Sequence, residues 1–254
     1  QPAAREGEGM PFPFFVSEKA AFPPQKTAEI PTAADESMKT YDTIIFDLDG
    51  TLLYTLEDLT DSVNHALAVC TDVRRTLEEV RTFVGNGVRR LMMRSLPGGE
   101  ENPHFEEAFA EFCRHYAEHC RDHTRPYPGV MKMAETLVLR GKKLGIVSNK
   151  PDREVKEMNA VFFGGMFGAA LGERQGVRRK PAPDSLLEAM KELGTDAEHA
   201  LYVGDSEVDI LTASAAGVDC LSVTWGFRSQ EHLQRAGAVR FIHAPEELLS
   251  QPGI

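Results

Sequence analysis

The sequence predicts an α/β protein, in which helices flank a mostly parallel sheet and a separate helical domain is inserted after the first strand. Short apolar runs alternate with amphipathic stretches from residue 43 onward, and strands that alternate with helices form right-handed βαβ units with parallel strands. Between residues 55 and 125 the pattern has only helical periodicity. We therefore expect a core formed by residues 38–54 and 126–254, and a helical cap formed by residues 55–125.

The individual elements follow from the hydrophobic pattern. The first expected strand is Thr43-Ile44-Ile45-Phe46, a continuous apolar run that suits a buried strand of a parallel sheet. The helices expected in the cap comprise residues 56–70, 77–83, 88–96 and 105–123. Later core strands are expected at residues 143–148, 167–171, 200–203 and 220–224, and core helices at residues 152–160, 184–193, 206–216 and 246–250.

The first 37 residues are expected to form a flexible N-terminal extension. They hold six of the fifteen prolines, and no hydrophobic period runs through them. Their one apolar patch, residues 11–16, is too short and too interrupted for the core of a signal peptide. Docking of Phe12, Phe14 and Phe15 on a partner or on the body of the protein is an alternative that the sequence leaves open.

Charge and composition argue against several classes of function. The formal net charge of −11 disfavours non-specific binding to nucleic acid, which needs a basic surface, and binding to an anionic membrane surface. No apolar run reaches the roughly 18 residues of a membrane-spanning helix. The four cysteines are scattered and form no CxxC pair, so a reduced, cytoplasmic protein is expected.

Polar side chains directly follow three of the predicted strands, and a lysine stands before a predicted helix. Because the carboxyl ends of parallel strands share one edge of the sheet, where open α/β sheets bind ligands, these side chains are expected to converge. A glycine among them, Gly50, lets the backbone approach a ligand and offers it an N–H group. The residues concerned are Asp47, Asp49, Gly50, Thr51, Ser148, Asn149, Lys180, Asp205 and Asp209.

This group of residues suits the hydrolysis of a phosphate ester. The uncatalysed reaction is among the slowest known, because an anionic ester repels an anionic nucleophile. Magnesium prefers hard oxygen ligands, and Asp47, Asp205 and Asp209 could supply the carboxylates that hold it. Lys180 and a small hydroxyl could bind the phosphoryl oxygens. A second carboxylate, Asp49, could serve as general acid for the leaving alcohol and then as general base for water.

Several strings of the sequence resemble a known family. Four of them look like the signatures of the haloacid dehalogenase superfamily, namely FDLDGTL at 46–52, VSNK at 147–150, RRKPAPD at 178–184 and YVGDSEVDI at 202–210. The resemblance runs from about Lys39 to Glu247. Within the superfamily the chain is most similar to the phosphoglycolate phosphatase group, on the strings LEDLTDSVNHAL at 56–67, FVGNGVRRLM at 83–92, PYPGV at 126–130 and VTWGFRS at 223–229.

The resemblance implies a Rossmann-like core with a helical cap inserted after the first strand, and it assigns roles to individual residues. Asp47 would be the nucleophile and Asp49 the general acid and base, with the Asp49 backbone carbonyl also binding Mg²⁺. Asp205 would be a metal ligand, and Asp209 would support the metal or orient Lys180. The contacts implied for the phosphoryl group are those of Ser148 and Lys180, supported by Thr51 and Asn149.

The cap contains candidates for substrate recognition. Asn86, Arg89 and Arg90 could reach a carboxylate of the substrate when the cap closes, whereas the alternative is a turn between helices with solvated arginines. Tyr54 replaces an aspartate that many relatives have at the entry to the cap. This departure concerns substrate preference and cap closure more than hydrolysis itself.

Two other features have simple structural explanations. His115, His119 and His123 follow one another at i,i+4 spacing, which can bind zinc, but a solvated helix face explains them more simply. The single tryptophan, Trp225, is expected to pack beside the active edge of the sheet rather than to contact substrate.

The function that the sequence predicts is a magnesium-dependent phosphatase acting on a small phosphorylated metabolite, with 2-phosphoglycolate as the leading substrate. Pyrophosphate, a nucleoside monophosphate and a sugar phosphate stay open as substrates. A phosphosugar mutase, which uses the same aspartyl-phosphate, and a non-catalytic protein that binds a phosphorylated ligand or a partner are the alternatives. Retention of both Asp47 and Asp49, together with Lys180 and Asp205, argues against a non-catalytic protein.

Overall fold

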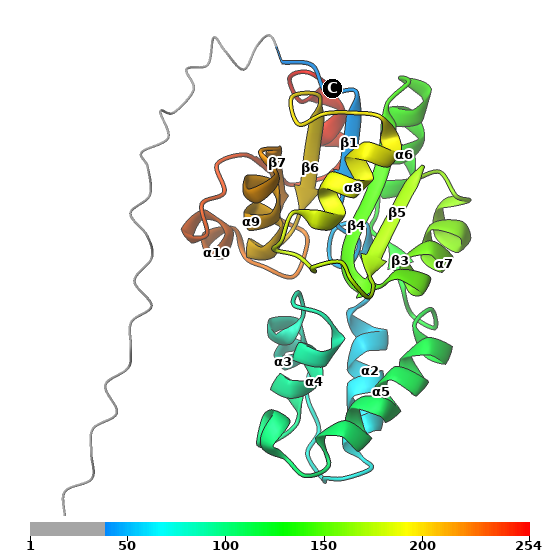
Figure 1. Cartoon of the computed structure of the whole chain (residues 1–254), viewed down its shortest axis with the longest axis vertical. Helices are drawn as coiled ribbons and strands as arrows, with labels where there is room; N and C mark the ends of the chain where they lie inside the picture. The colour runs from blue at the N-terminus through cyan, green and yellow to red at the C-terminus, as the bar shows by residue number, and fades with distance from the viewer. Residues whose placement is uncertain (1–38) are drawn as a thin grey trace, which may run out of the picture.

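The computed structural model describes residues 39–254, so the extension expected at residues 1–37, with Phe12, Phe14 and Phe15, lies outside the described residues. Within this range a six-stranded sheet has the strand order β5 (Ala169–Glu173), β4 (Lys143–Pro151), β1 (Thr43–Phe46), β6 (Ala200–Gly204), β7 (Asp219–Val223) and β8 (Phe241–Ile242). Every neighbouring pair of strands is parallel (Figure 1). The predicted α/β fold is therefore confirmed.

Helices cover both faces of the sheet, because successive residues of a strand point to opposite sides. The helices of the core are α6 (Val130–Leu139), α7 (Asp152–Phe163), α8 (Asp184–Leu193), α9 (Glu207–Ala216), α10 (Gln230–Arg235) and the 3-10 helix η2 (Pro245–Ser250). Ile44 and Phe46 of β1 are buried in the same cluster as the apolar side chains of α6, α7 and η2. Ile45 is buried in a second cluster with those of α8 and α9. The apolar run of β1 is thus buried on both faces, as its composition predicted.

The core departs from the sequence expectation at a few elements. The expected strand at residues 143–148 continues to Pro151, because the chain resumes its pairing with β5 after a shift of register. The expected strand at residues 167–171 begins only at Ala169, and the final helix is a 3-10 helix that begins at Pro245. Helices α6 and α10 were missed. Strand β8 was also missed, since two residues are too few for a periodic signal.

The residues of the expected cap form helices that lie beyond the carboxyl ends of the strands, where the arrows of the sheet point (Figure 1). Two short strands before and after these helices pair antiparallel, so the chain enters and leaves the cap at one place. The elements are β2 (Leu53–Tyr54), α2 (Leu56–Leu67), α3 (Leu77–Phe83), α4 (Val88–Ser95), the 3-10 helix η1 (Gly99–Glu101), α5 (Phe105–His119) and β3 (Arg125–Pro126).

Local hydrogen bonds explain how the cap is held together. Helix α3 begins at a capping box, in which the Glu79 N–H donates to the Thr76 hydroxyl at 3.2 Å and the Thr76 N–H donates to the Glu79 carboxylate at 2.8 Å. The buried carboxylate of Asp58, on α2, accepts the backbone N–H groups of His123 and Thr124 at 2.8 and 2.9 Å. These two bonds fasten the chain that leaves the cap to the helix that enters it.

Tyr54 lies at this crossing between cap and core. Its ring meets the ring of Tyr127 edge to face at 5.9 Å between centroids, and the guanidinium of Arg125 lies 4.7 Å from the Tyr54 ring centroid. An aspartate at this position could not make either contact. Tyr54 therefore takes part in aromatic and cation–π packing where the chain enters and leaves the cap.

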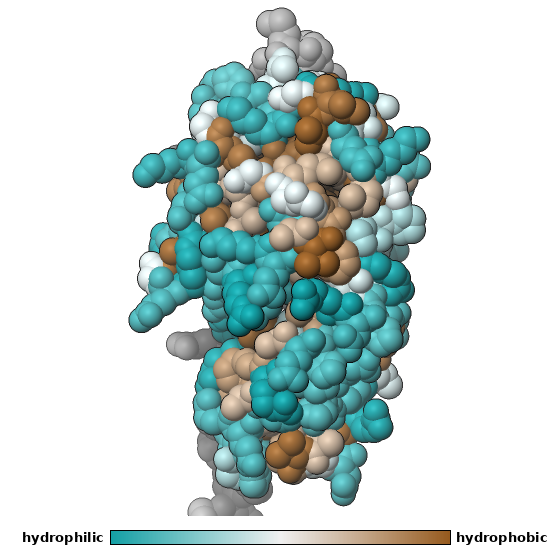
Figure 2. Space-filling view, turned by 90° about the vertical axis from the view of Figure 1, so that its right-hand side faces the viewer, coloured by the Kyte–Doolittle hydropathy of each residue, from teal (hydrophilic) through white to brown (hydrophobic). Residues whose placement is uncertain are grey.

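Seen from the side, the cap presents a mostly hydrophilic surface, and the hydrophobic residues in view gather mainly on the core above it (Figure 2). None of the helices in residues 39–254 is long and apolar enough to cross a membrane. Cys70, Cys113, Cys120 and Cys220 are free thiols.

Candidate active site

The loop that follows β1 brings its two aspartates to the carboxyl edge of the sheet. The loop is tight, because the Leu53 N–H donates to the Leu48 carbonyl at 2.9 Å. Gly50 has a φ of 91°, and a Cβ at this position would lie 2.4 Å from Oδ2 of Asp205. Only glycine combines this backbone conformation with so close an approach to a neighbouring strand end.

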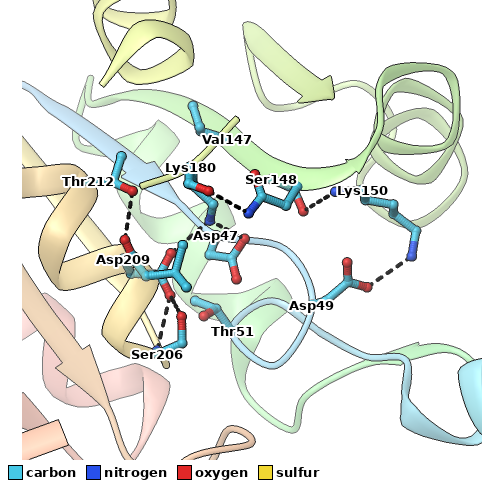
Figure 3. Close-up of polar contacts among 12 residues, drawn as sticks. Asp47, Asp49, Thr51, Val147, Ser148, Lys150, Lys180, Ser206, Asp209 and Thr212 are labelled. Carbon is cyan, nitrogen blue, oxygen red and sulfur yellow. Dashed lines mark hydrogen bonds and ion pairs between the residues drawn. The ribbon is translucent and has the colours of Figure 1, made fainter. Parts of the chain in front are cut away.

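Asp47 and Lys180 form the centre of a buried charge network (Figure 3). Lys180 Nζ donates to Asp47 Oδ1 at 2.8 Å and to Asp209 Oδ1 at 2.7 Å. It also donates to the Tyr202 hydroxyl at 3.0 Å. Burial by itself lowers the pKa of an ammonium, but the charges of Asp209 and Asp47 outweigh burial and raise the pKa of Lys180 well above its usual range. Lys180 is therefore a permanent cation beside Asp47.

Asp209 is engaged by protein donors on both of its oxygens. Oδ1 accepts hydrogen bonds from Lys180 and, at 3.1 Å, from the Tyr202 hydroxyl. Oδ2 accepts the Ser206 N–H at 3.0 Å and the Ser206 hydroxyl at 2.6 Å, and these contacts also begin helix α9. Of the two roles that the sequence left open for Asp209, this geometry favours the orientation of Lys180.

Asp205 directly follows β6 and contacts the loop that follows β7. Its Oδ2 accepts the Phe227 N–H at 2.6 Å, and its Oδ1 accepts the Thr51 hydroxyl at 3.4 Å. A Cβ at position 226 would lie 2.3 Å from the Asp205 Cβ, so Gly226 allows this loop to close on the carboxylate. Burial, and then the charge of Asp209, raise the pKa of Asp205 to about 7.

The three buried carboxylates fit a divalent cation. One oxygen from each of Asp47, Asp205 and Asp209 can be chosen so that all three lie within 4.8 Å of one another. Burial raises the pKa of Asp47 as well, against the lowering effect of Lys180, so a bound cation would stabilise the ionised form of both Asp47 and Asp205. Carboxylate oxygens are the donors that hard cations prefer. Both oxygens of Asp209 accept hydrogen bonds of 3.1 Å or less, whereas Oδ1 of Asp205 has only the 3.4 Å contact with Thr51, so Asp47 and Asp205 are the residues that would hold the cation.

The predicted phosphate-binding residues lie beside this group. The Ser148 hydroxyl, which accepts the Lys150 N–H at 3.2 Å, faces the same pocket as Asp47. Asn149 Nδ2 donates to the Lys180 carbonyl at 3.0 Å and to the Gly85 carbonyl of the cap at 3.2 Å. Ser148 is thus placed to contact a ligand, whereas Asn149 fixes the loop that carries Lys180.

A pocket lies between the carboxyl edge of the sheet and the cap. The two regions contribute different surfaces, because the core side is polar and charged and the cap side is almost entirely apolar. The cap contributes Leu59, Val84, Gly85, Gly87, Val88 and Leu91. The core contributes Asp47, Asp49, Ser148, Asn149, Lys150, Lys180, Asp205, Ser206, Phe227 and Arg228.

The structure does not bring the predicted cap residues into this pocket. Within residues 39–254 its lining omits Asn86, Arg89 and Arg90. Arg89 donates to Glu100 at 2.9 Å and to Glu106 at 2.6 Å. Since α4 starts at residue 88, Val88 and Leu91 face the pocket, and the two arginines between them in the sequence point elsewhere on the helix.

Two core residues that sequence reasoning passed over reach across to the cap. Lys150 donates to Asp49 of the core at 3.0 Å and to the Tyr116 hydroxyl of the cap. Arg228 donates to the carbonyls of Arg81 and Val84 in the cap at 2.9 and 2.6 Å. Both residues stand in strings that support the family resemblance, VSNK and VTWGFRS. Those strings were therefore the available signal, although neither indicates which side chain reaches the cap.

Trp225 and the histidines of α5, the remaining candidates, make contacts that packing explains. Trp225 Nε1 donates to the Thr51 carbonyl at 3.0 Å and packs against the core beside the site. The ring of His115 stacks between those of His65 and His119, at 4.1 and 4.3 Å between centroids, on the surface of the cap.

Comparison with known proteins identifies the family. The model of the haloacid dehalogenase-like hydrolase family matches residues 44–223. The chain belongs to this family. It is 38% identical over 192 residues to phosphoglycolate phosphatase 1 of Pseudomonas aeruginosa, and the aligned region covers 72% of this chain and 70% of the relative. It is 35% identical over 188 residues to phosphoglycolate phosphatase of Mesorhizobium japonicum, and the aligned region covers 72% of this chain and 83% of that relative.

Solved structures agree with this assignment. A candidate phosphoglycolate phosphatase from Lactobacillus delbrueckii subsp. bulgaricus superposes with a TM-score of 0.78 at 36% identity, over 83% of this chain and 97% of the other. A predicted phosphoglycolate phosphatase from Haemophilus somnus superposes with a TM-score of 0.77 at 28% identity, over 84% and 98%. The haloacid dehalogenase-like hydrolase predicted from the sequence is thus confirmed in family and in fold.

Proposed function

We propose that this hydrolase is a magnesium-dependent phosphatase that cleaves 2-phosphoglycolate through an aspartyl-phosphate on Asp47. As a phosphoric monoester hydrolase it agrees with its relatives, which are named phosphoglycolate phosphatases. The observation that carries the mechanism is the position of Asp47, which is paired with the buried cation Lys180 beside the carboxylate of Asp205. Asp49, two residues on, faces the same pocket.

The first half of the reaction uses Asp47 as nucleophile. One carboxylate oxygen of Asp47 forms a bond to phosphorus as the bond to the leaving oxygen breaks. The Lys180 ammonium and the Ser148 hydroxyl lie where they can bind phosphoryl oxygens. Asp49 gives its proton to the leaving oxygen, so the alcohol departs neutral.

The second half restores the enzyme. Asp49, now a carboxylate, takes a proton from water, and the resulting hydroxide attacks phosphorus and frees Asp47. Asp47, Asp205 and the backbone carbonyl of Asp49 would hold Mg²⁺, which supplies positive charge that offsets the repulsion between the carboxylate and the phosphate ester. Asp209 keeps Lys180 in place through both halves.

The wall of the pocket supports a small substrate. Leu59, Val84, Val88 and Leu91 close it from the cap side, and such a surface excludes water from the reacting groups. A carboxylate on the leaving group would be recognised by Asn86, Arg89 or Arg90 in a more closed arrangement of the cap. In that arrangement Arg89 exchanges Glu100 and Glu106 for the substrate.

The test is phosphate release from 2-phosphoglycolate, pyrophosphate, nucleoside monophosphates and sugar phosphates, each with Mg²⁺ and with chelator. A chelator-sensitive preference for 2-phosphoglycolate is expected. Chelator-sensitive release from another ester would keep the mechanism and change the substrate. Isomerised sugar phosphate without net phosphate release would replace the phosphatase by a mutase.

A further inference from the structure

A buried lysine connects Asp49 to the cap. Lys150, at the end of β4, donates from Nζ to Asp49 Oδ1 at 3.0 Å (Figure 3) and also to the hydroxyl of Tyr116 on α5. The Lys150 side chain is only 2% exposed, and that of Asp49 is 15% exposed. The ammonium also lies 4.7 Å from the centroid of the Tyr116 ring. One cation therefore contacts a reacting carboxylate of the core and a helix of the cap.

Folding alone gives little reason for a charge at this position. An ammonium is costly to bury, and an apolar side chain of similar length would fill the space without that penalty. The backbone N–H of the same residue donates to the Ser148 hydroxyl, so Lys150 lies between a phosphoryl contact and the general acid. A buried charge between two reacting groups indicates a role in the reaction rather than in packing.

We propose that Lys150 is a positioning residue for Asp49, which holds this carboxylate toward the pocket and, through Tyr116, makes its placement depend on the position of α5. The proposal rests on the proposed function, in which Asp49 protonates the leaving oxygen. A general acid must lie within hydrogen-bond reach of the oxygen that receives its proton. The ammonium restricts the Asp49 side chain before the reaction and stabilises the carboxylate that remains after the proton has left.

This role predicts that the effect of removing Lys150 depends on the leaving group. An alkoxide needs a proton as it departs, whereas acetate, the leaving group of acetyl phosphate, departs without one. Acetyl phosphate is also as small as 2-phosphoglycolate, so both fit the same pocket. The ratio kcat/KM reports the steps up to the departure of the leaving group and therefore isolates the proton transfer by Asp49.

The experiment compares wild-type protein with Lys150→Met on three substrates, and phosphorus NMR follows each reaction. The substrates are 2-phosphoglycolate, ethyl phosphate, which has an alkoxide leaving group but no carboxylate, and acetyl phosphate, which is an anhydride. We expect kcat/KM to fall about 100-fold on both alkyl esters and less than about tenfold on acetyl phosphate, as for the loss of a general acid. Lys150→Arg should restore part of the loss, because it keeps a cation that can reach Asp49.

Two further variants separate positioning from folding. Tyr116→Phe keeps the ring and removes the hydroxyl, and it should reproduce the same dependence on leaving group with a smaller loss. Lys156→Met removes an exposed lysine that is paired with Asp152 on α7, and it should leave all three rates unchanged. Melting temperatures of all variants verify that each protein is folded.

The outcomes that overturn the proposal are distinct. A loss confined to 2-phosphoglycolate would make Lys150 the partner of the substrate carboxylate instead. An equal loss on all three substrates, in a folded Lys150→Met protein, would reduce Lys150 to a structural residue. Wild-type protein inactive on every substrate would overturn the proposed function, and with it the role of Asp49. If the wild-type protein is active and Lys150→Met shows either the loss confined to 2-phosphoglycolate or the equal loss, only the positioning of Asp49 by Lys150 is overturned.

Discussion

The carboxyl edge of the sheet and the cap face the same pocket but differ in where their charged groups lie. At the edge the charged groups are buried and interlocked, so that Lys180 contacts Asp47, Asp209 and Tyr202 at once. In the cap the arginine of the predicted substrate site, Arg89, is 42% exposed and pairs with surface glutamates. The core therefore holds the charged groups of the site in fixed positions, while the cap supplies mainly an apolar wall.

The two regions are joined by polar contacts that can be exchanged. Asn149, Lys150 and Arg228 each donate hydrogen bonds from the core to the cap. Since water can replace such hydrogen bonds at small net free energy, we expect that the cap can separate from the core to admit substrate.

The largest effect on activity is expected for a change at Asp47, at the carboxyl edge of the sheet. Asp47→Asn removes the nucleophile while keeping its shape, and it should lower kcat on 2-phosphoglycolate at least ~1,000-fold, as for other enzymes that lose a nucleophile. Phosphate release measures the loss, and circular dichroism should show an unchanged fold. Residual turnover above a few per cent of wild type would reject Asp47 as nucleophile.

Removing Lys180, the buried cation at the carboxyl edge of the sheet, should affect stability as well as activity. Lys180→Met leaves Asp47 and Asp209 buried without their common partner, which should lower the free energy of unfolding by about 3–5 kcal/mol. Urea denaturation measures this change. The exposed pair of Lys156 is a matched control, because Lys156→Met should cost ~1 kcal/mol or less.

A double variant distinguishes charge from packing in this result. In Lys180→Met combined with Asp47→Asn one of the two stranded carboxylates is gone, so part of the lost stability should return. Equal destabilisation in the single and double variants would mean that the lost volume and hydrogen bonds, rather than an unpaired charge, cause the effect.

Cation binding should depend on pH through Asp205. The pKa of this carboxyl is raised to about 7, so the free energy of unfolding falls as pH rises from about 4 to about 7, and the loss stays constant above that. A divalent cation binds the ionised form, so its affinity should increase as pH rises through about 7. The increase in Tm on adding Mg²⁺ should therefore be larger at pH 8 than at pH 6.

Scanning calorimetry with Mg²⁺ and with chelator at both pH values measures this effect. Asp205→Asn removes a carboxylate that would hold the cation, and its Tm should respond weakly to Mg²⁺ at either pH. An identical Mg²⁺ effect at pH 6 and pH 8 in the wild-type protein would show that Asp205 does not control cation binding.

The difference between edge and cap also explains what could be predicted from the sequence. Asp47 and Asp205 could be placed together because each directly follows one of two parallel strands, and topology alone brings such strand ends to one edge. The contact of Lys150 with Tyr116 could not, because it joins residues 34 positions apart through the docking of the cap. The start of α4 at residue 88 was predicted correctly, but the sequence does not say which face of this helix packs against the core, so Arg89 was expected near the substrate.

The smallest effect on kinetics is expected for a change at Arg89 in the cap. It decides whether the cap recognises the substrate carboxylate or only closes the pocket with an apolar surface. If the arrangement described here is the one that reacts, Arg89→Ala should leave KM for 2-phosphoglycolate within about twofold of wild type, because this guanidinium is paired with Glu100 and Glu106. If a more closed cap carries Arg89 to the carboxylate, KM for 2-phosphoglycolate should rise while KM for ethyl phosphate stays unchanged. Steady-state kinetics on the two esters separates these cases, and a selective rise would assign recognition of the carboxylate to the cap.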